Sequence, residues 1–192
     1  MDGKPLVVGV LAVQGDFEKH LLKIKKLGVK ALEVRTGSEL SAVDALIIPG
    51  GESTTIKKVL SAGGMFAPLK EFAKTHPVFG TCAGSIMLAR TLADDPLETL
   101  GVMDITIKRN AYGSQVDSFI DTVRMNGQAL EAVFIRAPKI IQTGPDVTVL
   151  ITHQSDPVLV RQGRLLACTF HPELTSDNTI HRYFITMASN PA

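Results

Sequence analysis

The sequence predicts an α/β fold with a mixed, mostly parallel central sheet and helices on both faces. In the first half of the chain, short apolar runs rich in β-branched residues alternate with amphipathic helical segments over short connections, a pattern typical of a parallel sheet. In the second half, strand-like runs follow one another and helical periodicity nearly vanishes, so we expect the sheet to continue into antiparallel or mixed strands. A length of 192 residues, 45% of them hydrophobic and 20% charged, suits one domain spanning residues 1–192.

The first strand and the first helix are bounded by residues that interrupt them. Leu6–Val13 is almost continuously apolar, like a strand that is buried on both faces. Asp16 is suited to cap the following helix, whose apolar residues share one face as far as Leu27, and Gly28 is well placed to end it. The later elements of this half are expected as strands at Val29–Val34, at Ala45–Ile48 and from Val78, and as helices at Thr54–Leu60 and Met65–Lys74.

The second half is read as strands followed by one closing helix. We expect Gly163 to form the turn of a hairpin between the last two strands, and the Gly113–Asp117 segment to be an exposed loop. The helix is expected at Asn178–Ala188. The strand-like runs are Gly101–Arg109, Asp117–Met125, Ala132–Arg136, Val147–Thr152, Val158–Gln162 and Leu165–Phe170.

Charge and short motifs exclude several classes of function. A formal net charge of +1 argues against nucleic acid or an anionic membrane as the main partner, and the basic cluster Lys23, Lys25 and Lys26 is expected to be a solvated helix face. Leu6–Val13 is too short to span a bilayer and no cleavage site follows it, so we expect a cytoplasmic protein. The sequence contains no nucleotide-binding glycine motif, and its histidines lack metal-ligand spacing, so we expect no cofactor and no metal.

The stretch around Cys82 resembles a nucleophile elbow, a sharp turn between a strand and a helix. Gly80 and Gly84 flank the cysteine two positions away on either side, where a Cβ would crowd the turn. The amides that open the next helix favour a thiolate, and the amide of Ala83 can face an oxyanion. The alternative is a glycine-bracketed turn with an inert, buried cysteine; the other cysteine, Cys168, is expected in the core.

The segment His171-Pro172-Glu173 follows the last predicted strand. We expect Pro172 to hold the segment extended, so that residues two apart point the same way and the carboxylate of Glu173 orients the imidazole of His171. Alone, His171 is explained as a structural histidine at a strand end; with Cys82 it completes a Cys-His-Glu triad. The other histidines are predicted to be surface or structural residues: His20, His76, His153 and His181.

A glycine pair follows the predicted strand at Ala45–Ile48. Because the third and fourth strands should be neighbours, the Gly50-Gly51 loop is expected beside Cys82 and can supply a second backbone amide to an oxyanion. Gln14, Gly50 and Cys82 all lie at the carboxyl ends of strands, where parallel α/β sheets form their sites. Glu52 and Ser53 are then expected to rim the pocket.

These motifs resemble class I glutamine amidotransferases, whose Cys, His and Glu occur in this order. A narrower resemblance is to the glutaminase subunits of pyridoxal 5′-phosphate synthases. It implies a flavodoxin-like class I glutaminase architecture and spans nearly the whole chain. The stretches that carry it are GVLAVQG (9–15), PGGESTT (49–55), GTCAG (80–84), RNAYGSQVDSF (109–119), FIRAP (134–138) and FHPELT (170–175).

The resemblance implies that L-glutamine is hydrolysed to glutamate and ammonia. Cys82 is then the nucleophile, His171 moves protons and Glu173 orients it, with Gly51 and Ala83 at the oxyanion. Gln14 matches a residue that responds to the partner. The matching glutamine-binding positions are Gly50, Gly51, Glu52, Arg109, Ile135 and Arg136.

The partner follows from the same resemblance. Only about one helix of chain follows the triad, so the ammonia acceptor is expected on a separate protein, which the resemblance identifies as the barrel-shaped synthase subunit of a hetero-oligomer. Two alternatives stay open. The chain is the glutaminase of another pathway or a free γ-glutamyl hydrolase, or it is a non-enzymatic module that uses Cys82 as a redox sensor or for interaction.

Overall fold

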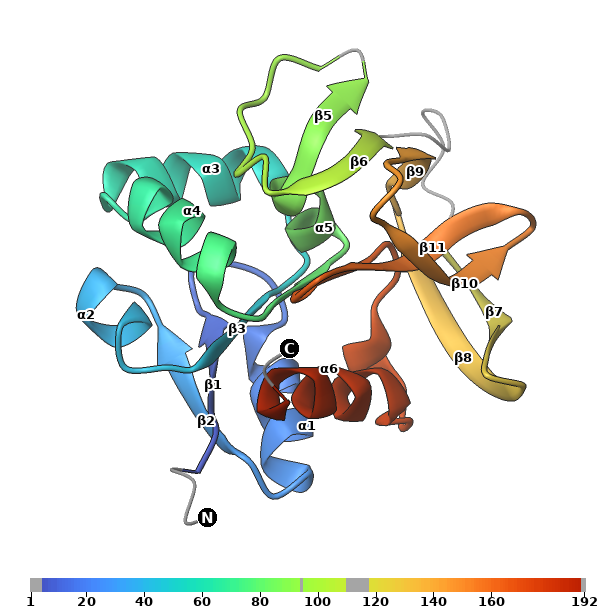
Figure 1. Ribbon diagram of the computed structural model, residues 1–192, viewed down its shortest axis with the longest axis horizontal. Coiled ribbons are helices and arrows are strands. Elements are labelled where there is room, and N and C mark those ends of the chain that lie inside the picture. The colour runs from blue at the N-terminus through green and yellow to red at the C-terminus, as the bar shows by residue number, and fades with distance from the viewer. Residues whose placement is uncertain (1–4, 94, 110–117, 191–192) are drawn as a thin grey trace.

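The computed structural model describes residues 5–93, 95–109 and 118–190, and within these ranges the molecule is built on a seven-stranded sheet (Figure 1). The order across this sheet is β10-β11-β12-β4-β3-β1-β2. The strands β2, β1, β3, β4 and β12 pair in parallel, and β11 and β10 are added by antiparallel pairing. Their bounds are β1 Val7–Leu11, β2 Lys30–Val34, β3 Ala45–Ile48, β4 Val78–Thr81, β10 Thr148–His153, β11 Asp156–Gln162 and β12 Leu165–Cys168. The predicted mixed, mostly parallel sheet is confirmed.

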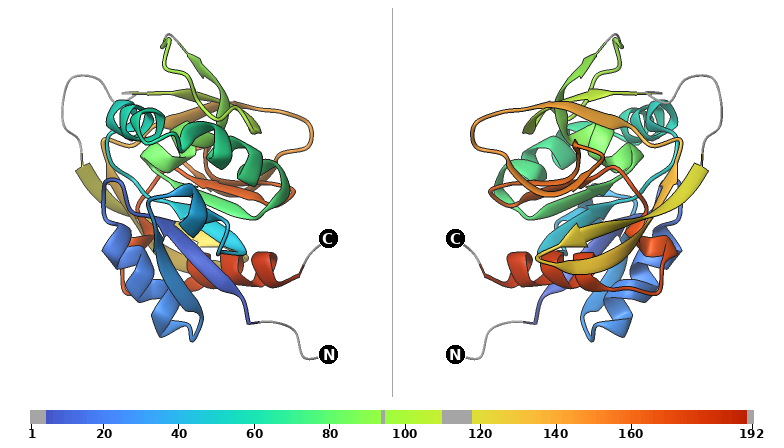
Figure 2. Two further views of the ribbon diagram at one scale, coloured as in Figure 1. Left: turned by 90° about the vertical axis from the view of Figure 1, so that its left-hand side faces the viewer. Right: turned by 90° about the vertical axis from the view of Figure 1, so that its right-hand side faces the viewer.

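Helices cover both faces of this sheet (Figure 2). Because alternate residues of a strand point to opposite faces, Leu46 and Ile48 of β3 join one apolar core and Ala45 and Ile47 join the other. The first core contains α2 (Gly37–Leu40), α3 (Ser53–Ala62), α4 (Phe66–Thr75) and α5 (Ala83–Leu88); the second contains α1 (Phe17–Lys26) and α6 (Thr179–Ser189). A 3₁₀ turn, η1 (Pro172–Leu174), lies between β12 and α6.

The second half of the chain departs from the prediction of a continuing sheet. Among the described strands of this half, only β10, β11 and β12 extend the central sheet; the others form a three-stranded sheet, β5-β6-β9, and a two-stranded hairpin, β7-β8. Alternating apolar residues indicate which face of a strand is buried, but strand pairing depends on distant contacts. The bounds are β5 Ala89–Ala93, β6 Met103–Lys108, β7 Ser118–Met125, β8 Gln128–Ile135 and β9 Lys139–Thr143.

Several boundaries were missed. The elements α2, β5 and β9 were not predicted, and β8 begins before the expected Ala132. Asn126 and Gly127 both have positive φ, 50° and 82°, and an Asn-Gly pair is the sequence signal for such a hairpin turn. Gly163, with φ 55°, forms the predicted turn between β11 and β12. The predicted loop at 113–117 lies outside the described residues.

The helix α1 begins after Asp16 as predicted, but Asp16 makes no side-chain cap hydrogen bond. The expectation of a solvated lysine face is wrong for Lys23, which is 6% exposed. Its ammonium donates to the carbonyl oxygens of Thr175 and Asp177, both at 2.6 Å. These bonds tie the chain after η1 to α1. In the part of the chain that the structure describes, no helix is both long and apolar enough to cross a membrane.

Candidate active site

The turn between β4 and α5 has the geometry that the glycine spacing predicts. Cys82 adopts φ 47° and ψ −108°, a region that costs a non-glycine residue strain and is often found at functional sites. A Cβ on Gly80 would overlap the carbonyl oxygen of Gly84, and one on Gly84 would overlap the carbonyl oxygen of Ile48. Both glycines are therefore required by close backbone approach.

The strand β12 brings His171 to Cys82. Because β12 pairs in parallel with β4, the amide of Cys82 donates to the carbonyl oxygen of Cys168 at 2.8 Å, and His171 follows three residues later. Nδ1 of His171 lies 2.7 Å from Oε1 of Glu173. The expected extended segment is wrong, since Pro172 opens the 3₁₀ turn η1, a first helical position that proline's fixed φ suits. The carboxylate still meets the imidazole, now across that turn.

Hydrogen bonding sets the charge of His171. Burial of the ring opposes a positive charge, but hydrogen bonds with Cys82 and Glu173 outweigh it and raise the pKa of His171 to about 10. The imidazole is therefore protonated at neutral pH. Sγ of Cys82 also lies 3.9 Å from the carbonyl oxygen of Ile135.

The Gly50-Gly51 loop packs directly on this pair, as expected from the parallel pairing of β3 and β4. A Cβ on Gly50 would lie 2.5 Å from Cε1 of His171 and 3.3 Å from Cβ of Cys82. Gly51 has φ 142°, a conformation that favours glycine. The side chain of Gln14 holds the loop from the other side, because its Oε1 accepts from the amide of Glu52 at 3.3 Å.

A cavity of about 360 Å³ opens in front of Cys82. Ten of the predicted site residues line it, as does the predicted rim residue Ser53, whereas Glu173 lies behind His171 and does not. Four further lining residues were not predicted as site residues: Gly15, Asp16, Ile86 and Pro138. The predicted residues that line it are Gln14, Gly50, Gly51, Glu52, Cys82, Ala83, Arg109, Ile135, Arg136 and His171.

Acidic groups hold Arg109 at the cavity. Its guanidinium donates to Asp95 at 2.7 Å and to the hydroxyl of Thr54 at 3.1 Å, and lies 3.5 Å from Glu52. The carboxylate of Glu52 caps α3 by accepting from the amides of Thr54 and Thr55. Burial raises the pKa of Glu52, but hydrogen bonds from Thr55 and Thr54 outweigh this and lower it to about 2. Asp95 was missed because no local pattern connects it with Arg109.

Two more cavity residues come from the end of β8. Ile135 is the last residue of that strand, and Arg136 follows it with φ 42°. Arg136 is exposed and lines the cavity. The strand hairpin outside the main sheet therefore contributes to a cavity whose cysteine follows a strand of the central sheet.

The side chains of Cys168, His20, His153 and His181 do not line the cavity. Cys168 is in the core as predicted, where burial raises the pKa of its thiol. His153 pairs with Asp121 at 2.8 Å. His20 and His181 are fully buried and do not lie on the surface. Within the described ranges, no group of three or more His, Cys, Asp or Glu is arranged to hold a metal ion.

Comparison with known proteins gives close relatives over almost the full length. The chain is 50% identical over 184 residues to "Pyridoxal 5'-phosphate synthase subunit PdxT" of Thermotoga petrophila, covering 94% of this chain and 98% of that protein. It is 50% identical over 196 residues to the protein of the same name from Acidothermus cellulolyticus, covering 96% of this chain and 95% of that protein.

Two solved structures have a similar fold. One described as a glutamine amidotransferase superposes with a TM-score of 0.90 at 45% identity, covering 95% of this chain and 99% of that one. PurLQS from Thermotoga maritima superposes with a TM-score of 0.75 at 13% identity over 96% and 99% of the two chains, which supports the fold alone.

The predicted resemblance to glutamine amidotransferases is therefore confirmed in sequence and in fold. The profile of one family, described as the SNO glutamine amidotransferase family, matches residues 10–190. With that match and relatives at 50% identity over most of its length, this chain belongs to the SNO glutamine amidotransferase family.

Proposed function

We propose that the chain, acting as one domain over residues 1–192, hydrolyses L-glutamine to L-glutamate and ammonia through Cys82, His171 and Glu173. The observation that carries the proposal is the strained elbow at Cys82 beside an imidazole whose Nδ1 lies 2.7 Å from a buried carboxylate oxygen. A positioned thiolate, a proton carrier and an orienting carboxylate form a working set for acyl transfer on unrelated folds.

In the first half of the reaction, the Cys82 thiolate attacks the side-chain amide carbon of glutamine. The oxyanion that forms accepts hydrogen bonds from the amides of Ala83 and Gly51, which flank the cavity beside the sulfur. The imidazolium of His171 gives its proton to the departing nitrogen, and the C–N bond breaks to release ammonia and leave a glutamyl thioester.

In the second half, His171 is neutral and takes a proton from a water molecule. The hydroxide attacks the thioester carbon, the C–S bond breaks, and glutamate leaves while Cys82 returns as thiolate beside the imidazolium. Glu173 keeps Nδ1 of His171 protonated throughout, so that Nε2 is the nitrogen that exchanges protons.

Charged groups around the cavity suit the two charged groups on the α-carbon of an amino acid. The guanidinium groups of Arg109 and Arg136 are suited to the α-carboxylate of glutamine. The ionised Glu52 suits its α-ammonium group, and the backbone of Ile135 and of Gly50 borders the space for the side chain. Charge complementarity to both groups on the α-carbon favours glutamine over an uncharged amide.

We propose that the ammonia passes to a separate barrel-shaped subunit in a hetero-oligomeric pyridoxal 5′-phosphate synthase. The names of the relatives support this assignment. Gln14 holds the amide of Glu52 next to Gly51, so a partner that displaces Gln14 changes the direction of the Gly51 amide and completes the oxyanion site. A free thiol nucleophile suits the reducing cytoplasm, where we place the reaction.

The test is glutamate release from L-glutamine by the protein alone and with the purified synthase subunit. We expect release that requires the synthase subunit and is lost in Cys82→Ala. Full turnover without the partner would keep the chemistry and contradict the role of Gln14. Release that persists in Cys82→Ala would contradict the proposed nucleophile.

A further inference from the structure

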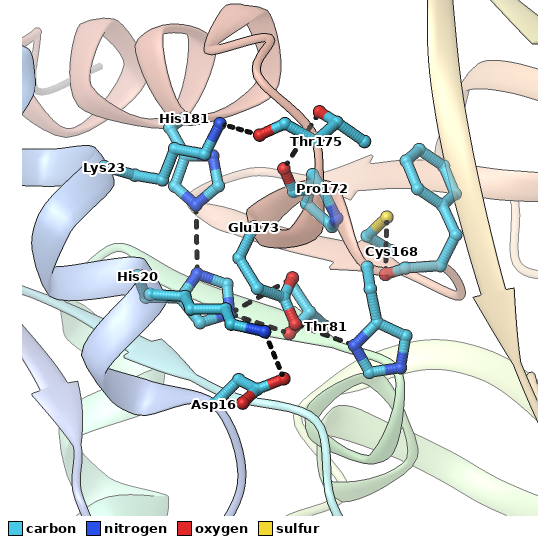
Figure 3. A network of polar contacts seen from close by, with 12 residues as sticks. Asp16, His20, Lys23, Thr81, Cys168, Pro172, Glu173, Thr175 and His181 are labelled. Atoms are coloured by element: carbon cyan, nitrogen blue, oxygen red, sulfur yellow. Dashed lines mark hydrogen bonds and ion pairs between the residues drawn. The ribbon is translucent and has the colours of Figure 1, made fainter.

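The carboxylate of Glu173 has two oxygens, and the triad uses one. Oε1 faces His171, while Oε2 lies 3.4 Å from Nε2 of His20 in α1 (Figure 3). Oε2 has no hydrogen-bond partner among the described residues, and Glu173 is 4% exposed. A buried carboxylate oxygen that lacks a donor is costly. A proton on Nε2 of His20, which faces this oxygen, would lower that cost.

Both histidines on this side of Glu173 are neutral. Burial lowers the pKa of His20 well below its usual value, and the positive charges of His171 and Lys23 act in the same direction. Burial, together with Lys23, lowers the pKa of His181 to about 3. Each ring therefore carries a single N–H, and Nδ1 of His20 lies 2.9 Å from Nε2 of His181.

The position of these protons follows from which atoms have partners. With its proton on Nε2, His20 can donate to the hydroxyl of Thr81, 3.2 Å away, and the same N–H lies 3.4 Å from Oε2 of Glu173. Nδ1 of His20 then accepts from Nε2–H of His181, which leaves Nδ1 of His181 as a bare lone pair. Nδ1 of His181 indeed has no partner among the described residues.

The other tautomer of His20, with its proton on Nδ1, is unfavourable for two reasons. With its proton on Nδ1, His20 would donate to His181 and turn its Nε2 lone pair toward the Glu173 carboxylate. His181 would then carry its proton on Nδ1, where the described residues offer no acceptor. A buried N–H without an acceptor is rarer and more costly than an unused lone pair.

We propose that His20 is a positioning residue whose Nε2–H holds Oε2 of Glu173, so that Oε1 is fixed on Nδ1 of His171. The inference rests on the proposed function, because it extends the same triad. Lys23, one turn later on the same face of α1, holds the segment after η1 through the carbonyls of Thr175 and Asp177. The helix α1 thus fixes both the carboxylate and the chain that carries it.

The sharpest test compares His20→Gln with His20→Asn. The amide nitrogen of glutamine falls near the place of imidazole Nε2 and can donate to Oε2, whereas the shorter asparagine places its amide near Nδ1 and cannot. We expect His20→Asn to lower kcat by about 10- to 100-fold, since loss of orientation near the chemistry costs about this much. KM should change by less than about 3-fold, because His20 does not line the cavity. The kcat of His20→Gln should stay within about 3-fold of the unsubstituted protein.

All rates are taken with the synthase subunit present and are normalised to the fraction of Cys82 that an electrophilic glutamine analogue titrates, which removes effects of misfolded protein. His76→Leu is the matched control. His76 is a histidine outside this network that stacks on Phe72, and its variant should keep the unsubstituted kcat.

A second readout does not depend on turnover. In ¹⁵N-histidine-labelled protein, the Nδ1 proton of His171 should give a low-field ¹H resonance that persists in His20→Gln and is lost or exchanges rapidly in His20→Asn. Equal losses of kcat in both variants, an unchanged kcat in His20→Asn, or a resonance unaffected by His20→Asn would each overturn the proposal. If His20→Asn does not fold, His20→Leu tests the same loss of the donor. Absence of glutamate release by the unsubstituted protein would refute the proposed function instead, and the resonance would still decide the role of His20.

Discussion

His171 and His20 face the same carboxylate from opposite sides and carry different charges. Both are buried, 7% and 0% exposed, yet the pKa of His171 is raised to about 10 and that of His20 is lowered well below its usual value. Burial opposes a positive charge on both rings; at His171 the hydrogen bonds with Cys82 and Glu173 outweigh it, whereas at His20 burial is the largest cause and nearby cationic groups such as Lys23 add to it. Depth alone therefore does not decide the charge of a buried histidine; its partners do. On the side of Glu173 toward the cavity the histidine is charged, and on the side toward the helix α1 it is neutral.

The largest effect should come from removing the shared carboxylate. Glu173→Ala deprives both histidines at once, so we expect kcat to fall by about 10⁴-fold and the free energy of unfolding to fall by about 3 kcal/mol. Kinetics with the partner and urea denaturation measure the two quantities. Cys82→Ala is the contrast, because it should abolish turnover and change the free energy of unfolding by less than about 1 kcal/mol. An unchanged denaturation curve for Glu173→Ala would show that the helix side does not depend on the carboxylate.

A smaller effect should come from crowding the cavity side alone. In Gly50→Ala the new methyl group would lie 2.5 Å from Cε1 of His171, so the ring must shift and kcat should fall by about 100-fold. Gly37→Ala is the matched control, since a Cβ there meets nothing within 4 Å and activity should not change. Normal turnover by Gly50→Ala would mean that the position of His171 tolerates displacement.

The smallest effect concerns acid stability on the helix side. The pKa of His181 falls from 6.5 to about 3 on folding, so below pH 6.5 the unfolded chain binds a proton that the folded chain refuses. The free energy of unfolding is therefore unaffected by His181 above pH 6.5. As the pH falls below 6.5, it decreases, by about 2 kcal/mol between pH 7 and pH 5. His171, whose pKa is raised, has the opposite sign, because its contribution is present below pH 6.5 and is lost toward pH 10.

Urea denaturation at pH 7 and pH 5 tests this sign. The loss of free energy of unfolding between the two pH values should be smaller in His181→Gln than in the unsubstituted protein by that same amount of about 2 kcal/mol. Identical losses in the two proteins would indicate that His181 is protonated in the folded state.

The residues around Cys82 and His171 could be predicted from the sequence because the motifs that mark them are short and local. Gly80, Cys82 and Gly84 lie within one turn, and His171 and Glu173 are two residues apart. The conformation between the latter pair was wrong, since Pro172 fits an extended chain and a first helical position equally well. Parallel strand order then placed Gly50 beside Cys82, because β3 and β4 follow one another in sequence and in the sheet.

The helix side was not predictable in this way. His20 and His181 are 161 residues apart in sequence, and neither has a neighbour that marks it as buried. Lys23 stands among other lysines and resembles a solvated residue until the carbonyls of the η1 segment are placed beside it. The pairing of β5, β6 and β9 was missed for the same reason, because contacts between distant segments decide which sheet a strand joins.

The position of β12 between β4 and β11 affects how the chain folds during its synthesis. During synthesis the elbow at Cys82 emerges long before β12 and His171, and the Cys82 amide finds its acceptor on Cys168 only when that late strand inserts. Closing so long a loop is a slow, late event in folding. In the proposed mechanism, a nascent or truncated chain therefore carries the nucleophile without its proton carrier, and glutamine hydrolysis becomes possible only after the last strand of the sheet has been made.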